Sequence, residues 1–253
     1  MNVVVASSRG AKVQKYLPKG TYVSLIEGGR LHQLLELAID SLPPPYGLKR
    51  RYHVYFLCGI PDITRLVKDY REGHRECIYD EDPAVTAERY YAELQDCQNA
   101  IKCRGALPIF VTIPKTNLDK YNHYCLEHNK TSVLKFTDQY PAMQIQLDEA
   151  INQINHHIYN LNKRVRVSTP FLHQSLTERR GPKSARYYVT KYDLLYDGLH
   201  AVKKMRKIWA GILTRTMAKN DSLEDSNDSE DEQRKRPWLP SSSSQRPGGE
   251  EDY

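Results

Sequence analysis

The chain has 253 residues, of which 40% are hydrophobic and 27% are charged, and its formal net charge is +6. This length can bury one sizeable core, and no run of about 18 apolar residues exists that could span a membrane as a helix. The start, MNVVVASSRG, lacks the basic region and the long apolar stretch of a signal peptide. We therefore expect one domain without a membrane span, located in the cytoplasm or the nucleus.

Short runs rich in Val, Ile, Tyr and Phe alternate along the chain with amphipathic helical patterns. The predicted strands are 2–6, 21–27, 52–59, 107–113 and 164–169, and the predicted helices are 30–41, 83–103, 139–162 and 201–217. Strands that alternate with helices favour a parallel sheet covered on both faces. The expected fold is therefore α/β, a three-layer α/β/α arrangement with a mostly parallel five-stranded sheet.

The composition changes near Asn220. The segment 220–253 is rich in Ser, Asp, Glu, Pro and Gly, and it carries ten acidic and four basic residues. Its net charge of −6 leaves +12 on residues 1–219. A segment with so few apolar residues cannot offset the entropy cost of ordering. We expect a folded, basic domain over 1–219 and a disordered tail over 220–253.

Parallel sheets bind ligands at the carboxyl ends of their strands, so the loops that follow the predicted strands contain the candidate site residues. The first strand is followed by Ser7 and Ser8, and the second by Gly28 and Gly29. The third is followed by the sequence GIPD, and the sequence YDGLH lies just before the last helix.

These loops carry the groups that acyl transfer needs. A serine hydroxyl becomes a nucleophile when an imidazole accepts its proton, and a carboxylate fixes the tautomer of that imidazole. Asp197 stands three residues before His200, and Ser8 is the candidate nucleophile. Each piece also has a simpler interpretation, since D-G-x-H is common as a capped turn and Gly28-Gly29 as a plain turn. Their order on successive strand-exit loops favours the joint interpretation.

The order of these pieces resembles the SGNH (GDSL-type) hydrolase family of α/β/α serine esterases, over residues 1 to about 217. The G-D-S block of the family corresponds to ASS at residues 6–8, and the D-x-x-H block is matched by Asp197 and His200. The resemblance implies a catalytic triad of Ser8, His200 and Asp197. It also implies an oxyanion hole that includes the N–H groups of Ser8 and Gly28.

Two blocks depart from the family pattern. Ser7 replaces the aspartate of G-D-S, and Pro61 replaces the asparagine of the G-x-N-D block, which here reads Gly59, Ile60, Pro61, Asp62. Proline has neither a side-chain donor nor a backbone N–H. Loss of one hole donor typically costs about 10²- to 10³-fold in kcat. The resemblance therefore implies an esterase with an incomplete oxyanion hole, for a small-molecule or acylated substrate.

A second hypothesis is that the same domain is catalytically impaired and binds nucleic acid or protein, as in SGNH-like domains of mobile-element and viral proteins. The basic body supports contacts to phosphates. Basic side chains in LNKRVRV, TERRGPKSARYY and AVKKMRK, with Tyr187 and Tyr188 as stacking groups, are the candidates. The simpler alternative is that these charges are only solvated, because no nucleic-acid recognition motif is visible.

Metal and cofactor binding are not expected. The five cysteines are odd in number and contain no C-x-x-C pair, which favours reduced thiols. His and Cys lie close together at His74 and Cys77, and again at His123, Cys125 and His128. Neither group has a second pair of ligands at usable spacing, so surface or core roles are favoured.

Overall fold

A computed structural model describes residues 1–10, 12–43, 51–63, 76–77, 81–129, 135–136 and 140–235. Four parallel strands form the central sheet in the order β2-β1-β3-β5. They are β1 (Asn2–Ala6), β2 (Tyr22–Leu25), β3 (His53–Leu57) and β5 (Leu107–Phe110). The long helices are α1 (Leu31–Ser41), α3 (Pro83–Cys103), α5 (Tyr140–Arg164) and α7 (Lys203–Lys235). The predicted α/β fold with a parallel sheet is confirmed.

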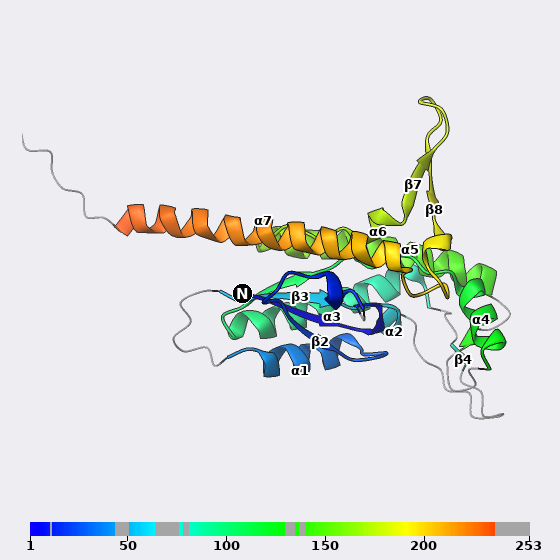
Figure 1. The fold of residues 1–253 in the computed structure, drawn as a ribbon, viewed down its shortest axis with the longest axis horizontal. Coiled ribbons are helices and arrows are strands. Elements are labelled where there is room, and N and C mark those ends of the chain that lie inside the picture. The colour runs from blue at the N-terminus through cyan, green and yellow to red at the C-terminus, as the bar shows by residue number, and fades with distance from the viewer. Residues whose placement is uncertain are drawn as a thin grey trace, which may run out of the picture.

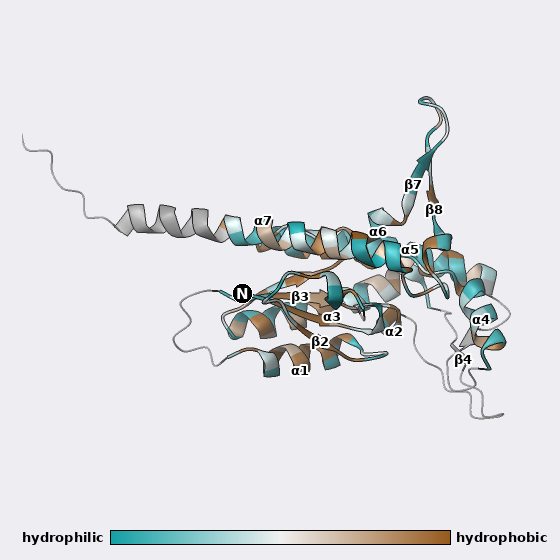
Figure 2. Cartoon of the chain, in the orientation of Figure 1, coloured by the Kyte–Doolittle hydropathy of each residue, from teal (hydrophilic) through white to brown (hydrophobic). Residues whose placement is uncertain are grey.

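Alternate side chains of the strands enter two separate cores, as the period of two in a strand requires. On one face, Val3 and Val5 pack with α1, α3 and α5. On the other face, Val4 and Ala6 pack with α7, whose Trp209 is 1% exposed. Figure 1 shows α7 running along one side of the sheet, and Figure 2 shows the predominantly hydrophobic colouring of the strands between the helices.

The predicted helix 83–103 has the bounds that the structure gives to α3. Asp82 caps it, because its side chain accepts hydrogen bonds from the N–H groups of Ala84 and Val85. Pro83 occupies the first helical position, where a missing N–H costs nothing. Local sequence alone is enough to specify this helix start.

Among the described residues the sheet has four strands and residues 164–169 form none, so the prediction of a fifth strand there is wrong. Arg164 ends α5, and Arg166 has a φ of 58°, which an extended strand does not permit. Other groups satisfy the outer edge of β5. The Asn162 side chain donates to Phe110 O and accepts from Phe110 N, and Pro170 O accepts from Thr112 N. Tertiary hydrogen bonds thus replace the expected strand.

Helix α7 also extends past the domain boundary predicted after residue 219. Asn220 is 2% exposed and contacts β3, and Asp221 Oδ1 lies 3.1 Å from Nδ1 of His53. The body of the protein therefore includes at least these two residues, contrary to the prediction. Residues 236–253 of the predicted tail lie outside the described residues.

The remaining elements are short. They are the 3₁₀ turns η1 (Ser8–Gly10), η2 (Gln14–Tyr16) and η3 (Tyr192–Leu194), the helices α2 (Ile60–Ile63), α4 (Leu118–Glu127) and α6 (Leu172–Ser175), the strand pair β4 (Glu76–Cys77) and β6 (Lys135–Phe136), and the strands β7 (Thr177–Arg180) and β8 (Tyr187–Thr190). Strands β7 and β8 form an antiparallel hairpin that projects away from the body in Figure 1. Among the described residues, no helix is long and apolar enough to cross a membrane.

Candidate active site

Ser8 lies at the carboxyl end of β1, where the chain leaves the sheet and enters the turn η1. The turn is held from both sides, since Ser7 N donates to Leu57 O of β3 at 3.1 Å and Gly10 N donates to Ser7 O at 2.9 Å. Ser7 is 1% exposed, whereas Ser8 is only partly buried. Of the two neighbouring hydroxyls, Ser8 is therefore the one that a ligand can reach.

Asp197 and His200 lie on the loop between η3 and α7. Oδ1 of Asp197 accepts the N–H groups of Leu199 and His200 at 2.9 and 2.6 Å, as in a capped turn. Its other oxygen, Oδ2, lies 2.6 Å from Nδ1 of His200. Burial alone would raise the pKa of Asp197, but these hydrogen bonds outweigh burial and hold the pKa below its ordinary value. Asp197 is thus an ionised, oriented partner of the imidazole.

The three predicted triad residues come together. Nε2 of His200 lies 3.1 Å from Oγ of Ser8, although the two residues are 192 positions apart in sequence. The chain of contacts therefore runs without a gap from Ser8 Oγ through the imidazole to Asp197 Oδ2. A hydroxyl, a base within hydrogen-bond reach and a carboxylate behind that base are the arrangement that nucleophilic acyl transfer uses.

The candidate oxyanion-hole positions also lie on strand-exit loops. Gly28 follows β2 in a turn and has a φ of 63°, while the next N–H, that of Gly29, donates to Ile26 O. This pattern leaves the Gly28 N–H as the candidate donor of the loop. Gly59 follows β3, and a Cβ placed on it would lie 3.7 Å from Ser7 Oγ. Pro61 follows within α2 and presents no donor.

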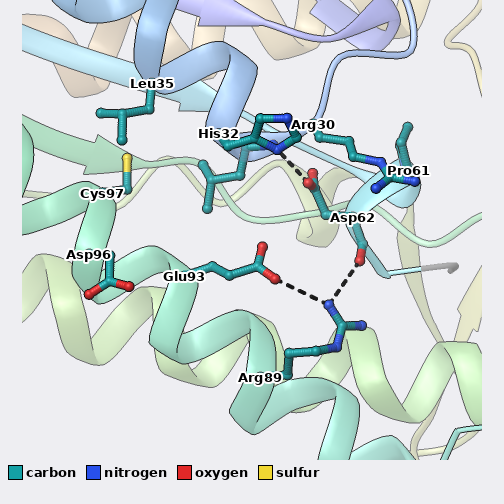
Figure 3. A pocket seen from close by; sticks show the side chains of 10 residues that line it. Arg30, His32, Leu35, Pro61, Asp62, Arg89, Glu93, Asp96 and Cys97 are labelled. Carbon is teal, nitrogen blue, oxygen red and sulfur yellow. Dashed lines mark hydrogen bonds and ion pairs between the residues drawn. The ribbon is translucent and has the colours of Figure 1, made fainter.

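Asp62 has a structural role that its place in the block did not reveal. Its Oδ1 accepts the N–H of Leu31 at 2.7 Å, which ties α2 to the first turn of α1, and its Oδ2 is buried without a hydrogen-bond partner. Burial raises the pKa of Asp62 to about 7, although the bond from Leu31 opposes the rise. Asp62, Arg89 and Glu93 are among the residues that line a cavity of about 530 Å³ between α1 and α3. In Figure 3 the carboxyl group of Asp62 faces the start of α1, and its backbone carbonyl faces Arg89.

Sequence reasoning missed two residues that contact the triad or lie beneath it. The Tyr196 ring stacks on that of His200, with centroids 5.7 Å apart and planes inclined by 23°. Arg9, the residue after Ser8, is buried with only 8% of its surface exposed. Neither residue belongs to a motif. The only sequence signal for Tyr196 was its position next to Asp197.

Of the residues considered as metal ligands, Cys125 is buried, and His123 and His128 bond through Nδ1 to carbonyl oxygens of their own helix. His74 lies outside the described residues. The part of the chain that the structure describes contains no cluster of three or more His, Cys, Asp or Glu side chains suited to a metal ion.

Known family models and curated protein sequences give no match to the chain, but solved structures do. A Bacteroides fragilis protein described as an acylhydrolase is 12% identical, with a TM-score of 0.52, and the match covers 86% of each chain. A GDSL-like lipase of Bacteroides thetaiotaomicron is also 12% identical, with a TM-score of 0.52, over 86% of this chain and 87% of that one. The chain has the SGNH hydrolase fold.

The SGNH fold explains why residues from opposite ends of the chain meet. In a parallel sheet the exits of all strands lie at one edge, and the loop before the last helix returns to that edge. A further match, to the C-terminal domain of Drosophila Oskar, is 13% identical with a TM-score of 0.46, over 85% of this chain and 87% of that one. At such identities the likeness concerns the fold, and the chemistry depends on the site residues themselves.

Proposed function

We propose that the chain is an SGNH-type serine hydrolase that acts on a carboxylic ester or an acetyl group. The observation that carries this proposal is the continuous contact from Ser8 Oγ to His200 Nε2 at 3.1 Å and from His200 Nδ1 to Asp197 Oδ2 at 2.6 Å. Such a relay activates a hydroxyl at neutral pH without a cofactor. The fold shared with acylhydrolases is consistent with this chemistry but does not specify it.

In this mechanism, Ser8 Oγ attacks the carbonyl carbon of the substrate while His200 Nε2 accepts the hydroxyl proton. Asp197 keeps the imidazole in the tautomer that has Nδ1 protonated and stabilises the imidazolium that forms. The N–H groups of Ser8 and Gly28 stabilise the oxyanion. The tetrahedral intermediate then expels the alcohol, which takes the proton from Nε2. Water, deprotonated by His200, attacks the acyl-Ser8 ester, and the acid leaves as Ser8 Oγ takes the proton back from Nε2.

The incomplete hole predicts a slow enzyme. Pro61 removes the third donor, and a lost donor costs about 10²- to 10³-fold in kcat, on the order of 3–4 kcal/mol. Ser7 does not offset this loss, because it is buried and its N–H already donates to Leu57 O. Enough of the machinery remains for attack by Ser8.

The test is labelling of the full chain with a fluorophosphonate, followed by intact-mass measurement. We expect a single adduct that disappears in Ser8→Ala and in His200→Gln. Ser7→Ala is the matched control, since it removes the neighbouring buried hydroxyl and should keep the adduct. Absence of any adduct on the folded parent protein, or an adduct that survives Ser8→Ala, would contradict the proposal.

A second candidate function is nucleic-acid binding, and the β7–β8 hairpin is the observation that favours it. Arg179 pairs across the two strands with Tyr188, and Arg180 pairs with Tyr187. Directly opposed residues lie on the same face of a hairpin and successive residues alternate, so each face carries one arginine and one tyrosine. Tyr187 is 56% exposed and Tyr188 is 70% exposed, as stacking on bases requires.

The turn of the hairpin adds Lys183 and Arg186, so the projecting element has four cations against the single acid Glu178. Binding of a mixed-sequence single-stranded RNA to the full chain, measured by fluorescence anisotropy, should weaken linearly with log[salt]. A Tyr187→Ala, Tyr188→Ala double variant should bind about tenfold or more weakly, and Tyr22→Ala, another exposed tyrosine, should not. Binding that does not depend on salt, or that is equal in all variants, would exclude this function.

The second candidate is the one that suits an impaired hydrolase fold encoded by a mobile element or a virus. We also propose a reducing compartment, the cytoplasm or the nucleus. Four of the five cysteines have described surroundings, and none of these four, Cys58, Cys97, Cys103 and Cys125, is in a disulfide.

A further inference from the structure

Arg9 follows the candidate nucleophile directly, and its side chain turns inward instead of toward solvent. Only 8% of the residue is exposed. An arginine is rarely buried to this degree, because removing a guanidinium from water costs free energy unless its charge and its donors are matched. The placement therefore needs an explanation.

The Arg9 side chain passes under three strand exits. It starts after β1, its Cδ lies 3.7 Å from where a Cβ on Gly59 would stand after β3, and its Nη1 donates to Pro114 O after β5 at 2.7 Å. Its other terminal nitrogen, Nη2, is buried without a hydrogen-bond partner. The hydrogen bonds of Arg9 are thus incomplete, which makes its burial a cost to stability.

The loop that Arg9 contacts is hydrogen-bonded to the turn that contains Asp197. Pro114 and Asn117 belong to one loop, and Asn117 N donates to Gly198 O at 2.9 Å, immediately after Asp197. The fit is close, because a Cβ on Gly198 would lie 2.3 Å from Asn117 O. Arg9 is therefore connected to the Asp197 turn indirectly, through the loop that contains Pro114 and Asn117.

Arg9 and Asp197 also interact electrostatically. Burial lowers the pKa of Arg9 to about 10, and the negative charge of Asp197 opposes that fall, so the guanidinium stays protonated at neutral pH. Asp197, for its part, faces the imidazole and the N–H of His200 and the N–H of Leu199. The buried guanidinium and the Asp197 carboxylate are thus close enough to interact electrostatically.

We propose that Arg9 is a positioning residue of the Ser8 site. From the interior, below the loops that follow the strands, Arg9 holds the Asp197 turn so that its carboxylate stays aligned with His200. The inference rests on the proposed function for the role of Ser8, but the contact it explains, from His200 to Asp197, exists whether or not Ser8 reacts. Arg9 acts through Asp197 and has no contact with a substrate in this scheme.

Replacement of Arg9 should affect the stability of the protein and the geometry of the His200–Asp197 hydrogen bond differently. Replacing a partly satisfied buried ion by an apolar side chain of similar length is often neutral or stabilising. Arg9→Met should therefore unfold at the same temperature as the parent protein or higher, while the short hydrogen bond between His200 Nδ1 and Asp197 loses its geometry. If Arg9 served only to stabilise the fold, its replacement would lower the unfolding temperature and disturb the Asp197–His200 hydrogen bond together.

The experiment measures the far-downfield proton resonance that a short histidine–carboxylate hydrogen bond produces, together with thermal unfolding of the full-length protein. The variants are Arg9→Met, Arg9→Gln and Arg9→Lys. Arg206→Met is the matched control, because Arg206 also bonds to a backbone carbonyl near His200, that of Ala201, but is only partly buried. His200→Gln assigns the resonance.

We expect the resonance to be lost or shifted in Arg9→Met and Arg9→Gln at unchanged or raised unfolding temperature, and retained in Arg9→Lys and Arg206→Met. If one of the two uncharged variants does not fold, the other decides. An unchanged resonance in a folded uncharged variant, an equal change in Arg206→Met, or no such resonance in the parent protein would overturn the proposal.

Fluorophosphonate labelling of the same set separates the two proposals. If the parent protein is labelled, Arg9→Met should react more slowly, by up to about 100-fold, as expected for a misplaced catalytic group. If the parent protein is not labelled, the hydrolase proposal fails, and the resonance alone still decides the role of Arg9.

Discussion

Asn220 in α7 donates through Nδ2 to the hydroxyl of Tyr55 in β3 at 3.2 Å, and both residues are buried. The same asparagine accepts the N–H of Ser168 through Oδ1 at 2.7 Å. One amide thus joins the last helix to the central sheet and to the segment that follows α5. It also lies just past the point where the composition of the chain changes.

Replacement of this asparagine should therefore destabilise the whole domain. Asn220→Ala leaves the Ser168 N–H without this acceptor, and a donor that loses its partner costs about 1–3 kcal/mol when it stays buried. Urea unfolding followed by circular dichroism measures the loss. Ser222→Ala, two residues further along the exposed side of the helix, is the control and should change little. Equal stability of the two variants would mean that the end of α7 does not contribute to the fold.

Asp62→Asn should stabilise the protein at alkaline pH. Burial raises the pKa of Asp62 from 3.8 to about 7, so the folded state keeps a proton that the unfolded state releases. Stability from this group is therefore lost as the pH rises from 4 to 7, by at most on the order of 4 kcal/mol. The amide oxygen of Asn can still accept the Leu31 N–H. The advantage of the variant should be absent near pH 4 and fully developed at pH 8.

Denaturant midpoints measured across that pH range test this expectation. Asp82→Asn is the comparison, because Asp82 is an exposed N-cap and loses rather than gains from neutralisation at the positive end of a helix. An Asp62→Asn advantage that is independent of pH would show that the carboxyl group does not titrate in this range.

Pro61→Asn should speed the reaction of Ser8. The substitution restores a side-chain amide where the SGNH pattern has its third oxyanion donor, and one donor is worth about 10²- to 10³-fold. The readout is the rate of fluorophosphonate labelling, or of hydrolysis of a small activated ester. Pro61→Ala removes the ring without adding a side-chain donor and serves as the control. If both variants react at the same rate, the side chain at this position does not reach the oxyanion.

Gly198→Ala should be far more harmful than Gly28→Ala, although both glycines have positive φ. At Gly198, with φ 85°, a Cβ would lie 2.3 Å from Asn117 O, whereas at Gly28, with φ 63°, nothing lies within 4 Å. Gly28→Ala should therefore cost only the conformational strain, about 1–2 kcal/mol. Gly198→Ala should cost more and should also abolish labelling, because the Asp197 turn must move. Thermal unfolding and labelling of the two variants provide the comparison.

The elements that could be predicted correctly are those that a few adjacent residues in the sequence define. Helix α3 was predicted to the residue because Asp82 and Pro83 mark its start, and the strand 2–6 because VVV is short, apolar and β-branched. The triad partners could be named because D-G-x-H has a recognisable spacing. Their convergence followed from the parallel sheet, which brings distant strand exits to one edge.

Predictions failed for segments whose structure or burial depends on contacts between distant parts of the chain. The RVRV pattern has the alternation of a strand, yet Asn162 and Pro170 already occupy the edge of β5 that it would need. Asn220 resembles the polar tail in composition, and only its contact with Tyr55 shows that it is buried. Arg9 resembles any surface arginine, because a cation directed into the interior leaves no periodic pattern. The hairpin was a basic, tyrosine-containing stretch whose strand pairing could not be read.

The side-chain amide of Asn162 affects how the protein can associate with other copies of itself. A parallel sheet that ends in an open strand can recruit a strand from a neighbouring chain, the first step toward fibrous aggregates. Here the outward N–H groups of Phe110 and Thr112 are already donated, to Asn162 and to Pro170, and Pro108 has none to offer. Strand addition is therefore blocked along this edge, so an assembly that extended the sheet would have to use another edge.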